Sequence, residues 1–479
     1  MKKTYVTKMP DHIGAFLKAS KCFSELGINI TRVSYNKAVD SHTLFIEVDG
    51  EESLFEIANA KLGEIGYLSN GEESSKIILI EFRLEDKPGS VTRVLELISQ
   101  FSFNISYISS QENGSGYQQF KMGLYVNESS NLTEFLTQAE NLCEVRVIDY
   151  NNTEKVFDNS IFYSSYVDGL VKTMGLSEKK KEELLVNVNL AMQTLDEKGL
   201  SPYKTFDSIS KFAELLAECK GENFKPRITE HVISENTKIT LIEPDCGSNT
   251  AIIESSGERV FVDSGYACYK NEMLELIKAL VPDFKERKEK IIVTHADVDH
   301  CGLLNSFDEV IVSRRSAESL IAEADRLAGF RERNSLHLPY VNICKALTEY
   351  EPVEKSKLCP MWNKSTLTLP IEQIGFYTVG ELSFEVYEGK GGHLPGEILL
   401  IDFEHKIAFS GDVYINLNDL TKKQAEYNQY APILMTSVDT DSTLCSKERV
   451  AFIQRLGVGE WSIFGGHGQK KTYSPQAIK

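Results

Sequence analysis

The sequence predicts a chain of mixed class, with two α+β units of the βαββαβ kind, a helical stretch and a C-terminal α/β domain. Three observations lead to this prediction. Residues 3–36 and 78–111 repeat each other. Residues 151–230 carry apolar side chains at helical spacing. From residue 231 onward, short apolar strands alternate with turns and helices.

Composition narrows the class of protein further. The 479 residues suffice for about three domains. The formal net charge of −18 argues against a nucleic-acid partner, which a basic surface would attract. The nine cysteines are scattered and include no CxxC pair, which indicates a reducing compartment. Because we find neither an export signal nor an apolar run long enough for a membrane helix, we expect a cytoplasmic protein without a membrane partner.

The repeat predicts two ferredoxin-like domains, at residues 1–72 and 73–150. Each copy reads as a strand, a glycine turn, an amphipathic helix and a second strand. Two later apolar stretches, FKMGLYV and VRVIDY, complete the second βαββαβ unit. Five identities recur at an offset of 75: Asp11 and Asp86, Gly14 and Gly89, Asn29 and Asn104, Ile30 and Ile105, Phe45 and Phe120.

The turn Asp86-Lys87-Pro88-Gly89-Ser90-Val91 resembles the DxPGxL signature of ACT domains, and the turn at Asp11 is a version without the proline. The resemblance implies a regulatory pair that binds an amino-acid effector and forms a homo-oligomer. A glycine lets the turn approach a ligand, and a helix N-terminus favours a carboxylate. The alternative is a pair that only dimerises. The expected ligand-binding residues are Asp86, Pro88, Gly89, Asn104, Asp11, Gly14 and Asn29.

The rest of the chain divides at residue 231. Residues 151–230 predict a helical linker, and GENFKPRITE predicts an irregular connection at its end. Residues 231–479 contain the strands KITLIEPD, TAIIESSG, ERVFVDSG and KIIVTH, followed by LSFEVYEG, EILLIDFE, KIAFSGD and WSIFGG. An insertion near 314–372 is expected to form a helical cap. Its five arginines could meet an anionic substrate: Arg314, Arg315, Arg326, Arg331 and Arg333.

A cluster of potential metal ligands follows the buried strand that ends at Thr294. His295, Asp297 and Asp299 lie on one side of an extended loop by the two-residue period, and His300 can turn back toward them. Two imidazoles and two carboxylates that converge suit one or two divalent metals. We expect the neighbouring Cys301 to be a small packing residue.

Three later polar residues also stand just past strands. They are His393 in GHLPG, Asp412 in SGD and His467 in GGHG. This order resembles the metallo-β-lactamase superfamily, in which HxHxDH precedes a His, an Asp and a His on an αββα sandwich. Asp263-Ser264-Gly265 matches the early Asp motif of that superfamily.

The resemblance implies a set of ligands for two divalent metal ions. His295, Asp297 and His393 resemble the ligands of the first metal. Asp299, His300 and His467 resemble those of the second, and Asp412 the bridging carboxylate. Asp299 is also the expected catalytic residue, which orients the attacking water and receives its proton.

Asp297 departs from the superfamily, in which most hydrolases carry histidine at this position. A carboxylate shifts metal preference from zinc toward manganese or iron without excluding zinc. The function implied is a metallohydrolase that uses a metal-bound hydroxide on an ester, thioester, lactone or phosphodiester, regulated by amino acids. The alternatives are a di-iron oxygen-binding or redox protein, a nuclease or phosphodiesterase, and a non-catalytic sensor.

Overall fold

The fold is described from a computed structural model, which places residues 2–8, 14–36, 43–65, 77–112, 117–125, 129–148, 163–198, 202–362, 367–435 and 438–474. The chain forms two compact units. The first comprises Met1–Gly169 and Lys181–Lys204, and the second comprises Leu170–Lys180 and Thr205–Lys479. Each unit is described separately.

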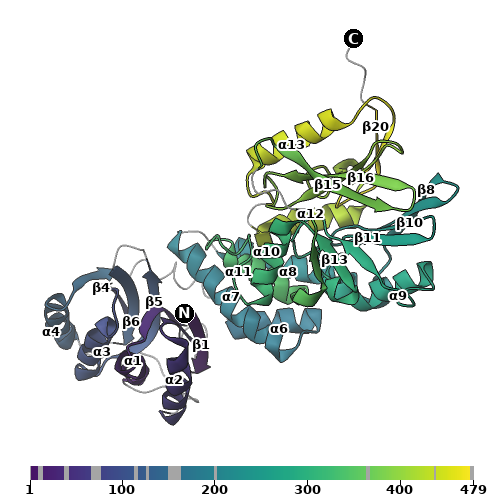
Figure 1. The fold of residues 1–479 in the computed structure, drawn as a ribbon. Helices are drawn as coiled ribbons and strands as arrows, with labels where there is room; N and C mark the ends of the chain where they lie inside the picture. The colour runs from purple at the N-terminus through teal and green to yellow at the C-terminus, as the bar shows by residue number, and fades with distance from the viewer. Residues whose placement is uncertain are drawn as a thin grey trace. The chain divides into compact units, whose positions relative to one another are not determined.

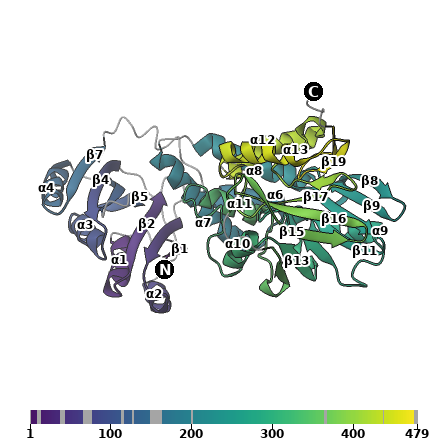
Figure 2. The ribbon, with the colours of Figure 1, turned by 45° about the horizontal axis from the view of Figure 1, so that its top comes forward.

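The N-terminal unit is built on one seven-stranded sheet with the order β1-β3-β2-β5-β6-β4-β7. The two repeat copies join through antiparallel β2 and β5, where Tyr35 faces Ile108. Helices α1 to α4 lie along one side of the strands (Figure 2). The strands are β1 (Lys2–Lys8), β2 (Asn29–Asn36), β3 (Thr43–Asp49), β4 (Ile77–Glu85), β5 (Asn104–Glu112), β6 (Tyr117–Tyr125) and β7 (Glu144–Ile148). The helices are α1 (Ala15–Glu25), α2 (Glu52–Glu64), α3 (Ser90–Gln100) and α4 (Ser129–Glu140).

The second copy has the complete βαββαβ order, so the predicted ferredoxin-like fold is confirmed there. Both strand-to-helix turns contain a glycine in the left-handed region, Gly14 with φ 78° and Gly89 with φ 84°. That conformation is costly for any residue with a Cβ. In the first copy, Asp11 and the stretch 66–76 expected to hold a fourth strand lie outside the described residues.

The described residues of the next stretch form three helices, as the apolar spacing predicts. They are α6 (Tyr163–Met174), α7 (Glu178–Glu197) and α8 (Pro202–Glu218). An apolar stripe on α8 is buried, with Phe206, Ile209, Phe212 and Leu216 each at most 3% exposed. The expected irregular connection after α8 is shorter than we predicted, because β8 already begins at Arg227. The sheet of the C-terminal unit thus starts before residue 231.

The C-terminal unit holds two sheets with helices outside them (Figure 1). One has the order β14-β13-β12-β11-β10-β9-β8, and the other runs from β15 to β20 in sequence. Side chains from both sheets share one buried core, which includes Ile253, Val262, Phe384 and Leu400. The predicted αββα sandwich is therefore confirmed.

The first sheet comprises β8 (Arg227–Ser234), β9 (Thr237–Glu243), β10 (Thr250–Ser255), β11 (Glu258–Val262), β12 (Lys290–Ile292), β13 (Glu309–Val312) and β14 (Leu358–Pro360). The second comprises β15 (Ile371–Val379), β16 (Leu382–Gly389), β17 (Ile398–Asp402), β18 (Ile407–Phe409), β19 (Trp461–Phe464) and β20 (Lys471–Tyr473). The helices are α9 (Lys270–Leu280), α10 (Arg314–Ala324), α11 (Leu338–Leu347), α12 (Lys422–Met435) and α13 (Ser442–Arg455).

The expected insertion at 314–372 contains the two helices α10 and α11, but it also contains β14. That strand pairs in parallel with β13 at the edge of the first sheet, so this part of the insertion extends the sheet. Within the described residues, no helix combines the length and the apolar character needed to cross a membrane.

Candidate metal centre

Parallel strands bring the polar loops of the C-terminal unit together. Strands β11 and β12 are parallel, Asp263 follows the first, and the loop of His295 follows the second. Strands β18 and β19 are also parallel, and Asp412 and His467 follow them. His393 lies between β16 and β17. Since the carboxyl ends of neighbouring parallel strands meet at one edge, side chains distant in sequence converge there.

The structure gathers all seven predicted metal-ligand residues into overlapping groups. Within each group, one ligand atom of every member lies within 4.8 Å of the others. The groups are His295 with His300 and Asp412, His295 with Asp297 and His393, and Asp299 with His300 and His467. The last two groups match the two sets implied by the resemblance.

Asp412 occupies the middle of the cluster. Its Oδ1 lies 3.6 Å from Nε2 of His300. Its Oδ2 lies 3.6 Å from Nε2 of His393 and 3.4 Å from Nε2 of His467. Asp299 lies at one side of the cluster, and its Oδ2 is 3.3 Å from Nε2 of His467. A carboxylate that faces three imidazoles would help to hold divalent cations there.

Outer partners orient three of the histidine rings by contacting Nδ1, which leaves Nε2 to face inward. Such contacts fix the tautomer and ring orientation of metal-binding histidines. The pairs are His295 with the hydroxyl of Thr294 at 3.0 Å, His300 with Asp263 at 2.9 Å, and His393 with Asp439 at 3.1 Å.

The inward-facing atoms lack hydrogen-bond partners among the described residues. Nε2 of His295, His300 and His393 and Oδ1 of Asp412 are buried and unpaired. Buried polar atoms are ordinarily satisfied, and several unpaired ones aimed at a common point indicate a ligand. Three nitrogens and a carboxylate oxygen are donors that suit a divalent cation. The residues present therefore fit a bound metal.

The carboxylates of the cluster favour positive charge on His467. Burial lowers the pKa of His467, but Asp412 and Asp299 outweigh it and raise that pKa to about 10. Burial also raises the pKa of Glu397, which lies behind the cluster, to about 8. The negative charge of Asp412 and Asp299, which keeps a proton on His467, would also attract a metal cation.

Residues 244–420 match the family model of the metallo-beta-lactamase superfamily. This part of the chain belongs to that superfamily. The matched residues include six of the seven clustered ligand candidates, all except His467. No curated protein matches the sequence.

Solved structures that resemble the chain include a metallo-beta-lactamase from Pontibacter korlensis, with 16% identity, 51% of this chain and 94% of that chain covered, and a TM-score of 0.31. A flavoprotein from Thermotoga maritima has 17% identity, 51% and 58% coverage, and a TM-score of 0.33. An aspartate kinase from Synechocystis has 14% identity and a TM-score of 0.25. There 31% of this chain is covered, and the chain spans only 28% of the kinase.

Arg331 lies at the candidate metal centre, although the sequence suggested only substrate contact for it. Its Nε and one terminal nitrogen donate to Oδ2 of Asp297, at 3.0 and 2.6 Å. Asp297 thus stands beside His295 and His393, as predicted, but it also pairs with a cation from the insertion. Nothing in the local sequence around Asp297 could have identified that partner.

Two buried glutamates support the loops of the centre, and sequence reasoning missed both. Glu397 accepts from the backbone N–H of Asp412 at 2.7 Å. Glu448, on α13, accepts from the backbone N–H groups of Gly391 and Gly392, the residues before His393. The adjacency of Glu397 to the GHLPG motif is the one sequence signal that could have indicated its role.

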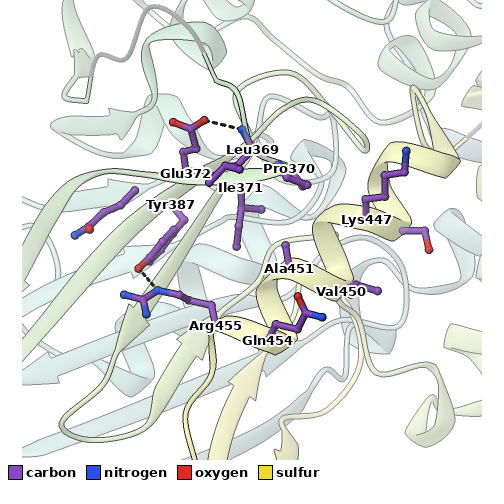
Figure 3. Close-up of a pocket in the computed structure, with 12 residues that line it drawn as sticks. Leu369, Pro370, Ile371, Glu372, Tyr387, Lys447, Val450, Ala451, Gln454 and Arg455 are labelled. Carbon is purple, nitrogen blue, oxygen red and sulfur yellow. Dashed lines mark hydrogen bonds between the residues drawn. The ribbon is translucent and has the colours of Figure 1, made fainter.

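Cys301 is buried, and its thiol lies 3.7 Å from the carbonyl oxygen of His295, so its packing role agrees with expectation. A separate open pocket is lined by β15, β16 and α13 (Figure 3). There Nε of Arg455 donates to the hydroxyl of Tyr387 at 2.5 Å. None of the candidate ligands lines this pocket, which is therefore distinct from the candidate metal centre.

In the N-terminal unit, the predicted ligand-binding residues meet across the two copies. The amide of Asn29 donates to Asp86 at 2.7 Å, and that of Gln118 donates to the same oxygen at 2.8 Å. Asn29 and Gly89 line one small cavity, and Gly14 and Asn104 line another. Of the remaining predicted residues, Pro88 is exposed and Asp11 lies outside the described part.

Proposed function

We propose that the C-terminal unit is a metal-dependent hydrolase. The observation that carries this proposal is the convergence of unpaired, buried Nε2 atoms from His295, His300 and His393 on the carboxylate of Asp412. When bound there, divalent ions supply Lewis acidity and lower the pKa of water toward neutrality. Zinc, manganese and iron all suit this donor set of imidazoles and carboxylates.

The side chains of the centre would hold the ions, orient the attacking water and accept its proton. His295 and His393 are held by their Nδ1 partners, which positions Nε2 before any ion arrives. Asp299 lies on the more open side of the cluster, where His467 and Asp412 are 12% and 9% exposed. Asp299 is therefore placed to orient the attacking water and to accept its proton on a carboxylate oxygen.

The chemistry of the centre is compatible with four substrate classes. A centre that activates water and polarises the carbonyl or phosphoryl oxygen of the substrate suits esters, thioesters, lactones and phosphodiesters alike. A panel of chromogenic substrates from these four classes distinguishes them. Turnover of phosphodiesters alone would favour the phosphodiesterase alternative over an acyl hydrolase.

Elemental mass spectrometry of the full-length protein tests the proposal. We expect about two divalent ions per chain. Asp412→Ala should lose both ions and hydrolysis, and His295→Ala should lose hydrolysis together with the ion held beside it. His405→Ala is a matched control, because that ring contacts Asp402, away from the cluster, and should keep the ions and hydrolysis. Full hydrolysis by the metal-free protein would refute the proposal. Bound iron with an oxygen-dependent visible spectrum would instead support the di-iron redox alternative.

We also propose that the N-terminal pair binds an amino-acid effector and supports a homo-oligomer. The carboxylate of Asp86 and the amides of Asn29 and Gln118 can recognise an α-amino and an α-carboxyl group. Calorimetry against the twenty amino acids, with Asp86→Asn as the comparison, tests effector binding. If no amino acid binds, the alternative of a pair that only dimerises is favoured.

A further inference from the structure

Arg331 connects three parts of the metallo-β-lactamase unit. It lies in the insertion between α10 and α11, and it donates twice to Oδ2 of Asp297. It also donates to the carbonyl oxygen of Val438 at 3.0 Å. Val438 directly precedes Asp439, which orients His393. The guanidinium thus ties the Asp297 loop to the segment that holds His393.

The pair is almost completely withdrawn from solvent. The side chains of Arg331 and Asp297 are 5% and 3% exposed. A guanidinium keeps its proton in proteins, so this is a full positive charge within the centre. In such surroundings charges interact more strongly than they do in water.

The pairing makes the two ends of the cluster unequal. Both oxygens of Asp297 are engaged, because Oδ1 accepts from the backbone N–H of Val298 at 3.0 Å. At the other end, Asp299 and Asp412 face histidine nitrogens, and none of the hydrogen bonds described for these two carboxylates comes from an arginine or a lysine. A divalent ion beside Asp297 meets a carboxylate that is already paired with a guanidinium, whereas one beside Asp299 meets two carboxylates whose described partners are histidine nitrogens.

We propose that Arg331 sets a stepwise order of metal binding. One ion binds tightly at the end formed by Asp299, His300, His467 and Asp412. The second, at His295, Asp297 and His393, binds about tenfold or more weakly, which is within the range that outer partners of metal ligands exert. This inference rests on the proposed metal centre and specifies how its two positions differ.

Titration of the chelator-treated, full-length protein with Co²⁺ tests the order, with calorimetry and the visible absorption of bound cobalt as readouts. The wild type should bind two ions with constants that differ by about tenfold or more. Arg331→Gln removes the charge and should bring the two constants close together. Arg331→Lys retains the charge and should keep them apart. Arg333→Gln alters an exposed arginine that stacks on Phe330, and it should leave both constants unchanged.

Two wild-type ions with indistinguishable constants would overturn the inference while leaving the hydrolase proposal intact. The inference would also be overturned if Arg331→Gln left the ratio of the two dissociation constants unchanged, or if the second ion bound more weakly than in the wild type. Arg331 would then act only by orienting Asp297. Failure of the wild type to bind any ion would overturn the proposed metal centre itself. If Arg331→Gln does not fold, Asp297→Asn provides the second test: it should lose the weak ion and keep the tight one.

Discussion

The carboxylate of Glu448 accepts hydrogen bonds from the backbone N–H of Gly392 at 3.0 and 3.1 Å. Glu448 is 1% exposed and belongs to α13, whereas Gly392 immediately precedes the predicted ligand His393. The same carboxylate accepts from Gly391 at 2.9 Å. Helix α13 therefore fixes the backbone of a metal-binding loop through a buried charge.

Glu448→Gln should destabilise the C-terminal unit by about 2 kcal/mol, because hydrogen bonds to a buried charged acceptor are lost or weakened. Urea unfolding of the metal-free protein measures this change. Lys447→Gln, at the exposed neighbouring position, should stay within about 0.5 kcal/mol of wild type. Equal stability of the two variants would show that the loop holds its shape without Glu448.

Gly466→Ala should abolish metal binding while the unit stays folded. A Cβ at this position would overlap Oδ1 of Asp412 and lie 2.7 Å from Cε1 of His300. At Gly457 a Cβ meets nothing within 4 Å, so Gly457→Ala is the matched control. Metal content and circular dichroism distinguish the two variants. Full metal occupancy in Gly466→Ala would contradict the packing that the structure shows.

Removal of metal should lower the melting temperature of the C-terminal unit. A ligand present at a hundredfold excess over its dissociation constant stabilises the folded state by about 2.7 kcal/mol, or about 5–10 °C for a unit of this size. Calorimetric scans with and without a chelator measure the shift. Asp412→Ala should not respond to the chelator. A chelator effect of equal size in that variant would point to a metal bound elsewhere.

Ser110→Ala should loosen the junction between the two N-terminal copies. The hydroxyl of Ser110 accepts from the backbone N–H of Val33 at 2.7 Å, across the β2–β5 pair. Without it, a buried donor loses its partner at a cost of about 1–3 kcal/mol. Hydrogen exchange at residues 29–36 should become faster. Ser24→Ala removes a half-buried hydroxyl of α1 that contacts Lys21 and should leave exchange at residues 29–36 unchanged. Equal rates in both variants would argue against the continuous sheet.

Local patterns predicted most of the fold. The helix at α3 followed from the spacing of Val91, Val94 and Ile98, which are all buried. The offset of 75 correctly placed Gly14 and Gly89 at equivalent left-handed turns. The boundary at residue 231 was less accurate, because Pro226 and the polar residues after it suggested an irregular linker where β8 lies. An edge strand with an alternating exposed face carries little apolar signal.

The sequence by itself determined which residues could form a metal centre, because the candidate ligands stand directly after short apolar strands and the order of the motifs is local information. Tertiary structure alone decided how those ligands are held. Arg331 meets Asp297, Glu448 meets Gly392, and Asn29 meets Asp86 across separations of 34, 56 and 57 residues. Such pairs form only when separate loops close on a shared core, and neither composition nor periodicity encodes which charge will face which.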